Sequence, residues 1–248
     1  MDIQNKYGTL ERQQSLLKMM KDLHSFLVEN GIYYSMAWGS LIGTIRENGF
    51  VPWDDDIDIF MDRHNYNKFL NCCEQMEGYR VEKLLWVNRI KRSSDGFGKY
   101  HIPTIDIFVV DNAPDNKFLF NTKVFLLRLL QGMIKKKPKS KERSAKNIAL
   151  TALHYFGKIL PMKVKQDLYE KISQIGNKKK TSCVGCFNSD YLTIIVKYKA
   201  NFMENLELHK FEDTEFYIVC EYDEHLRQVY GDYMTPPKKS ERVALHLD

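Results

Sequence analysis

The stretch GSLIGTIRENGFVPWDDDIDIFMDR, residues 39–63, decides how this part of the chain must fold. Four of the five residues from 54 to 58 are aspartates, and they lie between a Pro-Trp pair and an apolar run. Carboxylates crowded this closely repel one another, and burying them is costly unless a positive partner is held among them. The identity of that partner determines the function of the segment.

Residues 56–61 alternate as in a strand with one buried face. Because successive side chains of a strand point to opposite faces, Asp56 and Asp58 share one face while the neighbouring isoleucines enter the core. Two carboxylates on a rigid strand can each give an oxygen to Mg²⁺ or Mn²⁺, and substrate phosphates and water complete the coordination of such an ion. We expect one or two ions. Asp106 is the candidate for a third carboxylate on a neighbouring strand, because its apolar neighbours repeat the same pattern.

The turn before this strand offers a place for an anion. Gly39 and Ser40 lie between a predicted strand, residues 32–38, and a predicted helix, residues 41–48, with Ser40 as the N-cap. Backbone N–H groups at a helix start and the helix dipole favour phosphate, and glycine lets it approach the backbone closely. We therefore predict that Gly39 and Ser40 contact phosphate.

Two basic residues are further candidates for binding phosphate. Arg46 lies within the helix predicted after Ser40, and Lys99 ends the stretch GFGK at 96–99, which lacks the Walker pattern. The alternative for each is a surface residue that binds nothing, since single Arg and Lys side chains mostly lie exposed to solvent.

Other interpretations of the acidic run were compared with the metal site. A calcium loop counted from Asp54 would need glycine at Ile59 and glutamate at Asn65, so the EF-hand interpretation fails. A sugar-nucleotide transferase of the DxD type and an acidic surface loop stay open as alternatives. The metal site is favoured because the Ile-Asp-Ile-Phe pattern occurs twice.

The composition of the 248 residues is that of a globular protein, with 44% hydrophobic and 28% charged residues. A net charge of +5 gives no reason to expect a nucleic-acid partner. We see neither a leader sequence nor an apolar run of about 20 residues, and the five cysteines suit a reducing compartment. We expect a cytoplasmic protein, or one peripheral on the inner face of the membrane. The CxxC at 183–186 is interpreted as two free thiols rather than half of a zinc site.

The pattern along the chain predicts three parts: a catalytic core at 1–115, a helical segment at 116–185, and strands and a helix at 186–248 that complete the core. Within the middle part, the apolar residues 118–134 precede the basic residues 135–146. This combination is typical either of a buried helix with a solvated loop or of a helix that rests on an anionic membrane.

The segment from Gly39 to Met61 closely resembles the signature of the LicD family. Further matches lie at IDIF, residues 105–108, and at YGDYMTPP, residues 230–237. The resemblance implies an α+β, nucleotidyltransferase-like fold of the polymerase beta type, in which helices flank a mixed sheet and a helix-rich insertion occupies the middle of the chain.

The resemblance also implies a reaction: transfer of a phospho-alcohol, phosphocholine from CDP-choline above all, to a hydroxyl of a teichoic acid, lipopolysaccharide or capsule, with release of CMP. Asp56 and Asp58 then correspond to the metal-binding pair, and Asp106 is a third ligand, the general base, or both. Asp54 and Asp55 occupy the acidic lead-in. Transfer of ribitol phosphate, glycerol phosphate or another nucleotide-linked group is one alternative, and a non-catalytic protein that binds nucleotide or glycan is another.

Overall fold

The structure is a computed structural model that describes residues 7–95, 102–135 and 145–244. The chain divides into two compact units. The first unit consists of Met1–Leu84, Asn88–Val110 and Asn201–Asp248, and the second consists of Leu85–Val87 and Asp111–Ala200. The second unit thus extends beyond the predicted helical segment 116–185 at both ends.

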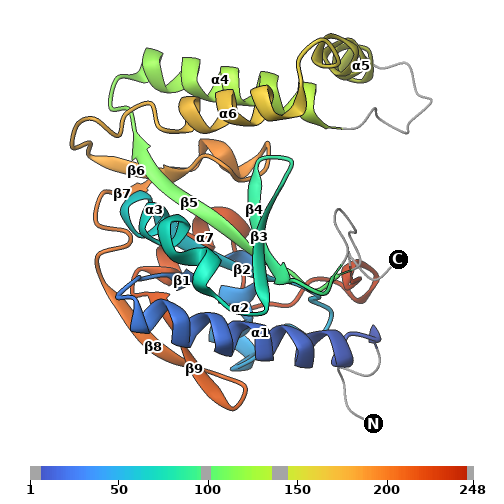
Figure 1. Cartoon of the computed structure of the whole chain (residues 1–248), viewed down its shortest axis with the longest axis vertical. Helices are drawn as coiled ribbons and strands as arrows, with labels where there is room; N and C mark the ends of the chain where they lie inside the picture. The colour runs from blue at the N-terminus through green and yellow to red at the C-terminus, as the bar shows by residue number, and fades with distance from the viewer. Residues whose placement is uncertain (1–6, 96–101, 136–144, 245–248) are drawn as a thin grey trace. The chain divides into compact units, whose positions relative to one another are not determined.

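The main sheet has the strand order β1–β2–β5–β4–β3. These strands are β1 (Ser35–Met36), β2 (Ile57–Asp62), β3 (Tyr79–Leu84), β4 (Val87–Arg92) and β5 (Ile105–Ala113). The central pair β2–β5 is parallel, whereas β1–β2 and β4–β5 are antiparallel. The predicted α+β class with a mixed sheet flanked by helices is therefore confirmed, and Figure 1 shows α1 (Leu10–Glu29), α2 (Trp38–Glu47) and α3 (Arg63–Cys72) beside this sheet.

Helix α1 forms where the apolar period predicts it. Leu16, Met20, Leu23 and Leu27 follow one helical stripe and are fully buried. The stripe removes apolar side chains from water, which is the main favourable contribution to folding. The N-terminal end of α1 lies against the acidic loop, because side chains of its first turn donate hydrogen bonds to the backbone of that loop.

The predictions around α2 were wrong in two places. The predicted strand 32–38 shortens to the two residues of β1, and the helix begins at Trp38 instead of Leu41, with Ala37 as the N-cap. Ser40 is therefore inside the first turn, where its Oγ accepts a hydrogen bond from the backbone N–H of Asp58 at 3.0 Å. At the other end Asn48 takes the left-handed conformation (φ 53°), a role that Asn can fill in place of glycine.

The last residues of the chain complete the first unit. A hairpin of β8 (Leu206–Phe211) and β9 (Thr214–Val219) leads to α7 (Tyr222–Tyr230), which matches the predicted helix. The backbone N–H of Val219 donates to Ser35 Oγ at 2.9 Å, so that the hairpin is joined to β1.

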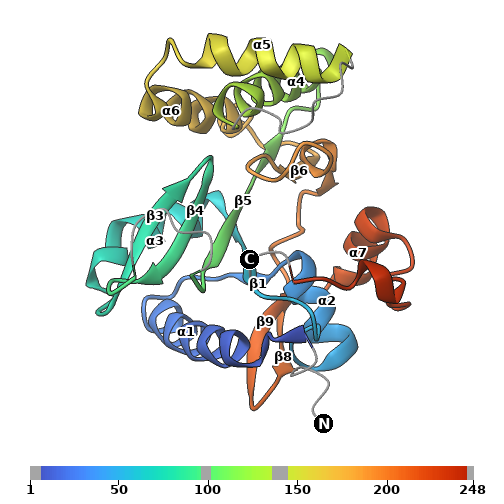
Figure 2. The ribbon, with the colours of Figure 1, turned by 90° about the vertical axis from the view of Figure 1, so that its right-hand side faces the viewer.

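The second unit is built on three helices, α4 (Lys117–Ile134), α5 (Ala145–Gly157) and α6 (Met162–Ser173), which lie together in Figures 1 and 2. It also contains β6 (Cys183–Cys186), which pairs with β5, and β7 (Tyr198–Lys199), together with η3 (Thr193–Ile195). In its core the Trp86 ring stacks on Tyr169 with 5.5 Å between the ring centroids. Neither cysteine of the CxxC forms a disulfide.

Candidate active site

Two of the predicted carboxylates lie side by side on adjacent strands. The parallel register of β2 and β5 pairs Asp58 with Asp106. Side chains at the same level of neighbouring strands share a face, and the fully buried isoleucines on either side hold each aspartate on that face. The charge of Asp106 is one of the causes that raise the pKa of Asp58, as expected for two neighbouring carboxylates.

The loop before β2 adds three more carboxylates. One oxygen each from Asp54, Asp55 and Asp56 lies within 4.8 Å of the others. In the part of the chain that the structure describes, this is the only group of three or more His, Cys, Asp or Glu residues arranged to hold a metal ion. The predicted ligand set of Asp56, Asp58 and Asp106 is not itself such a group among the described residues. The sequence indicated Asp56 as a ligand but assigned Asp54 and Asp55 only to the acidic lead-in.

Five carboxylates lie in this region, and the guanidinium groups of Arg12 and Arg89 both interact with members of the group. Burial raises the pKa of Asp58 well above its ordinary value of 3.8, and the charges of Asp56, Asp106 and Asp54 raise it further, while Arg89 lowers it. Burial also raises the pKa of Asp54, to which the charges of Asp56 and Asp55 add. An all-oxygen donor set with this excess of negative charge fits a hard divalent cation such as Mg²⁺ or Mn²⁺.

Arg89 is a cation that the structure places directly on a strand carboxylate. The antiparallel register of β4 and β5 sets Arg89 opposite Asp106, and its Nε and Nη2 donate to Asp106 Oδ2 at 3.0 and 2.7 Å. Charge-assisted hydrogen bonds of this kind favour the ionised carboxylate. The role of Arg89 was not predicted, because nothing in the sequence fixes the register of β4 against β5.

The first turn of α1 binds the backbone of the acidic loop. Three side chains of this turn and its N-cap donate hydrogen bonds to carbonyl groups between residues 51 and 55. Thr9 Oγ1 donates to Pro52 at 2.8 Å, Gln13 Nε2 to Val51 at 3.1 Å and Asp54 at 2.7 Å, and Arg12 Nε to Asp55. These three residues position the acidic loop and with it the carboxylates, but they are not candidate ligands. The sequence did not predict them, because their partners lie about 40 positions further along the chain.

The predicted phosphate site at the start of α2 is lined by a carboxylate. A Cβ atom at Gly39 would lie 2.6 Å from Asp54 Oδ2, so glycine is required for Asp54 to rest on this first turn. A helix N-terminus stabilises such an anion. Ser40 binds the backbone of Asp58, as described above. Phosphate contact by Gly39 and Ser40 stays a prediction, and Lys99 lies outside the described residues.

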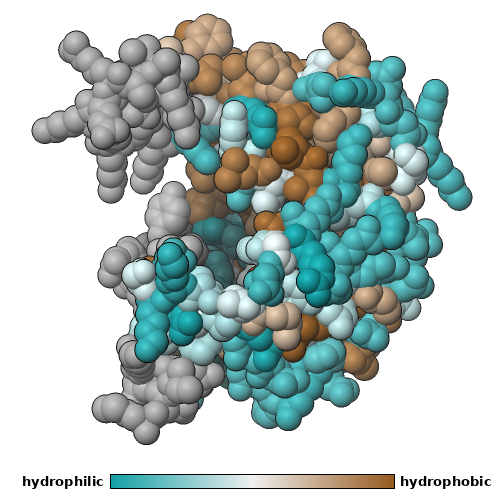
Figure 3. Space-filling view, turned by 180° about the vertical axis from the view of Figure 1, so that it is seen from behind, coloured by the Kyte–Doolittle hydropathy of each residue, from teal (hydrophilic) through white to brown (hydrophobic). Residues whose placement is uncertain are grey.

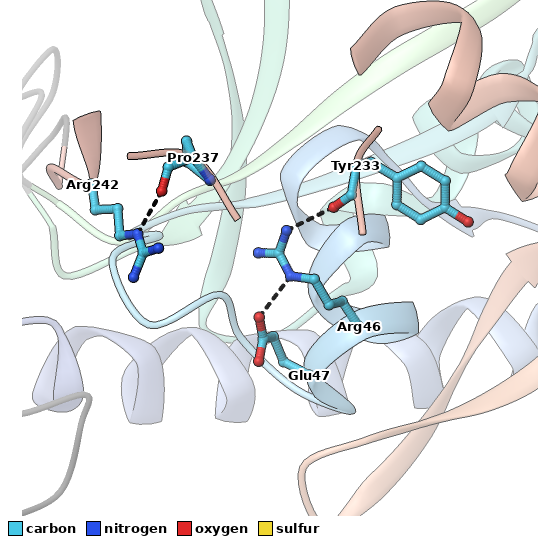
Figure 4. A network of polar contacts seen from close by, with 5 residues as sticks. All are labelled: Arg46, Glu47, Tyr233, Pro237 and Arg242. Carbon is cyan, nitrogen blue, oxygen red and sulfur yellow. Dashed lines mark hydrogen bonds and ion pairs between the residues drawn. The ribbon is translucent and has the colours of Figure 1, made fainter. Parts of the chain in front are cut away.

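Arg46 ties α2 to the C-terminal segment (Figure 4). Its Nη1 donates to the carbonyl of Tyr233 at 2.8 Å and its Nε to Glu47 at 2.7 Å, and only 9% of the side chain is exposed. The Trp53 ring lies 6.0 Å from this guanidinium and 5.1 Å from that of Arg242. These contacts give Arg46 a structural role in addition to the phosphate role that we predicted for it.

We expect Arg46→Gln to destabilise the protein by about 1–3 kcal/mol, because it removes a largely buried charged donor from the Tyr233 carbonyl. Urea unfolding measures this change, and limited proteolysis should show earlier cleavage between residues 230 and 237. The control is Arg227→Gln, which removes an exposed ion pair with Asp223 and should change stability little. Wild-type stability combined with a raised KM for the donor would assign Arg46 to phosphate instead.

A mixed sheet that presents clustered carboxylates beside a helix N-terminus is the kind of site that enzymes of phosphoryl transfer use. Residues 31–127 match the family described as LicD/FKTN/FKRP, nucleotidyltransferase domain. The chain is 30% identical over 262 residues to the lipopolysaccharide cholinephosphotransferase LicD of Haemophilus influenzae, covering 96% of each chain. The chain belongs to the LicD family, which confirms the predicted resemblance and the enzyme class at the level of the family.

A second relative shares only part of the chain. An uncharacterised protein of Rickettsia prowazekii is 34% identical over 109 residues, which is 43% of this chain and 36% of that protein.

Proposed function

We propose that this protein transfers phosphocholine from CDP-choline to a hydroxyl of a cell-surface glycan and releases CMP, with Mg²⁺ or Mn²⁺ as cofactor. The observation that carries the proposal is the pairing of Asp58 with Asp106 on adjacent parallel strands. It occurs in a chain that is similar along nearly its whole length to a lipopolysaccharide cholinephosphotransferase. A nucleotidyltransferase-like fold of the polymerase beta type is part of the proposal.

The reaction is an in-line displacement at phosphorus. The acceptor oxygen forms a bond to the β-phosphorus of the donor, the bond from that phosphorus to the bridging oxygen breaks, and CMP leaves. The hydroxyl proton passes to a carboxylate of the site or to water. The work of the protein in such reactions is mainly positioning and stabilisation of charge.

The carboxylates have different parts in this scheme. Asp56, Asp58 and Asp106, the predicted ligands, would hold one or two cations together with Asp54 and Asp55 of the 4.8 Å group, and these cations would neutralise charge on the donor diphosphate. Arg89 donates two hydrogen bonds to Asp106 Oδ2, which weakens Asp106 as a base. We therefore assign Asp106 to cation binding ahead of proton transfer.

A comparison of CDP-linked donors tests the proposal. We expect CMP release from CDP-choline in the presence of lipopolysaccharide, a fall of more than about a hundredfold with a chelator, and recovery on adding Mg²⁺ or Mn²⁺. Faster CMP release from CDP-ribitol or CDP-glycerol would show that ribitol phosphate or glycerol phosphate is transferred instead of phosphocholine. Binding of CDP-choline by calorimetry without CMP release on any lipopolysaccharide, teichoic acid or capsule would identify a binding protein and refute the enzyme.

A further inference from the structure

The second unit exposes large apolar side chains where α5 connects to α6. In this corner, residues 155–168, Phe156 is 63% and Ile159 72% exposed. Four other large apolar side chains of the corner are also exposed: Tyr155, Met162, Val164 and Leu168. Figure 3, the view from behind, shows further apolar surface in its upper part, on the side away from the α5–α6 connection seen in Figure 2. Soluble proteins seldom leave so many large apolar side chains together in water without a partner.

The same unit carries most of the positive charge of the protein. Between residues 111 and 200 there are 19 Lys and Arg against 6 Asp and Glu, a net charge of +13, whereas the rest of the chain carries −8. Lys158 and Lys163 stand exposed among the apolar side chains of the corner. The ammonium of Lys158 lies 4.8 Å from the Tyr155 ring centroid, so the basic and apolar groups occupy one surface.

The corner is fixed by contacts beneath it. The buried Lys165 donates from Nζ to the carbonyl of Gly157 at 2.8 Å and to that of Met133 at 3.3 Å, so it joins the ends of α4 and α5 to α6. A Cβ atom at Gly157 would lie 2.4 Å from the oxygen of Met133, which shows how closely these ends pack. The exposed side chains of the corner cannot take part in that core.

Helix α4, by contrast, is largely part of the core. For residues 118–146 the sequence left open a buried helix with a solvated loop or a helix that rests on a membrane. The buried Phe120, Val124 and Leu127 favour the first interpretation for α4, and residues 136–144 lie outside the described residues. Its exposed apolar side chains include Phe118, Leu119 and Phe125, and Phe118 and Phe125 lie on the opposite side of the helix from the buried ones.

We propose that the corner at residues 155–168 binds the surface of an anionic phospholipid bilayer. Its apolar side chains enter the boundary between headgroups and acyl chains, and Lys158 and Lys163 bind lipid phosphate, as in other interfacial segments. A second copy of the chain is a poor occupant, because its own corner carries the same positive charge. The contact is interfacial, since no helix among the described residues is long and apolar enough to span a bilayer. If the proposed function holds, the surface brings the enzyme to a lipid-linked acceptor.

Vesicle flotation tests this surface with the full chain. We expect binding to vesicles of phosphatidylcholine mixed with phosphatidylglycerol, weaker binding to phosphatidylcholine alone, and loss of binding as salt is raised. The double variants Phe156→Ser/Ile159→Ser and Lys158→Glu/Lys163→Glu should each lower the partition coefficient by about tenfold or more. The matched control, Leu208→Ser/Lys210→Glu on β8, changes an exposed apolar and an exposed basic residue of the first unit and should bind like the wild type.

The outcomes separate this surface from the proposed function. Equal binding by wild type and corner variants, no binding, or equal binding to both kinds of vesicle would overturn the membrane surface. A dimer that the corner variants dissociate would overturn it as well. CMP release with a water-soluble oligosaccharide acceptor should be unchanged in the corner variants. If the chain releases no CMP at all, the proposed reaction fails while the flotation result stands by itself.

Discussion

Asp58→Asn should reduce transfer by about a thousandfold or more while the protein stays folded. Asp58 stands on the central parallel pair of strands, opposite Asp106, and interacts with Asp54 and Asp56 as well. Replacing it with an amide removes a negative charge of a proposed ligand from the cluster with little change in the size of the side chain. Removing one group that stabilises charge in a transition state typically costs a factor of about 10² to 10³, and a lost cation adds to that. The measurement is CMP release at saturating CDP-choline and Mg²⁺.

The same substitution should stabilise the metal-free protein. The folded-state pKa of Asp58 is raised, so its ionisation opposes folding above the unfolded pKa of about 3.9. We expect Asp58→Asn to gain on the order of 1 kcal/mol at pH 7, roughly 2–4 °C in Tm, and to lose this advantage below about pH 4, where the carboxyl is neutral in both states. Added Mg²⁺ should stabilise the wild type, since it binds the folded form alone, and should have less effect on the variant.

The control is a carboxylate that is exposed and paired with a lysine, whereas Asp58 is buried among other carboxylates. Asp213 is exposed, and the hydrogen bond from Lys21 lowers its pKa. Asp213→Asn should therefore leave activity unchanged and cannot raise the stability at pH 7. If Asp58→Asn is as active as the wild type, or is less stable than the wild type without metal at pH 7, the crowded-carboxylate account of the site is wrong.

The parts of the site that the sequence predicts follow from short-range periodicity. The alternation of apolar and acidic residues predicted that Asp58 and Asp106 lie on strands. Their identical apolar flanks suggested that these strands are neighbours, and the parallel register of β2 and β5 confirms it. The apolar stripe of α1 and the helix at 222–230 were predicted on the same basis. Each of these inferences needs only the residues within one element.

The remaining parts of the site depend on contacts between elements distant in the chain. Arg89 reaches Asp106 because β4 pairs with β5 in one particular register. Arg12 and Gln13 bind a loop about 40 positions further on. The early start of α2 has the same kind of cause, since the hydroxyl of Ser40 binds the backbone of β2 and does not cap its own helix. Local patterns therefore predicted ligands, whereas the residues that position them required the structure.

Gly43→Ala is expected to be the most destabilising substitution of the signature segment. Gly43 lies in the middle of α2, where alanine would ordinarily be more favourable by about 1 kcal/mol. Here a Cβ atom would lie 2.4 Å from the carbonyl oxygen of Gly49 and 3.1 Å from the backbone N of Val51. Both are main-chain atoms, so the chain that leads into the acidic loop must move. We expect a loss of about 2–4 kcal/mol, measured by urea unfolding, and a loss of activity.

Gly39→Ala on the same helix is the matched control, because it adds the same methyl group against a different neighbour. Its Cβ would meet only the carboxylate of Asp54, which can rotate away, so stability should stay within about 1 kcal/mol of the wild type. Transfer should fall nevertheless, since Asp54 leaves the start of α2. The packing predicts that Gly43→Ala is less stable than Gly39→Ala. If the two variants are equally stable, the close contact of residues 49–51 with α2 does not explain why residue 43 is a glycine.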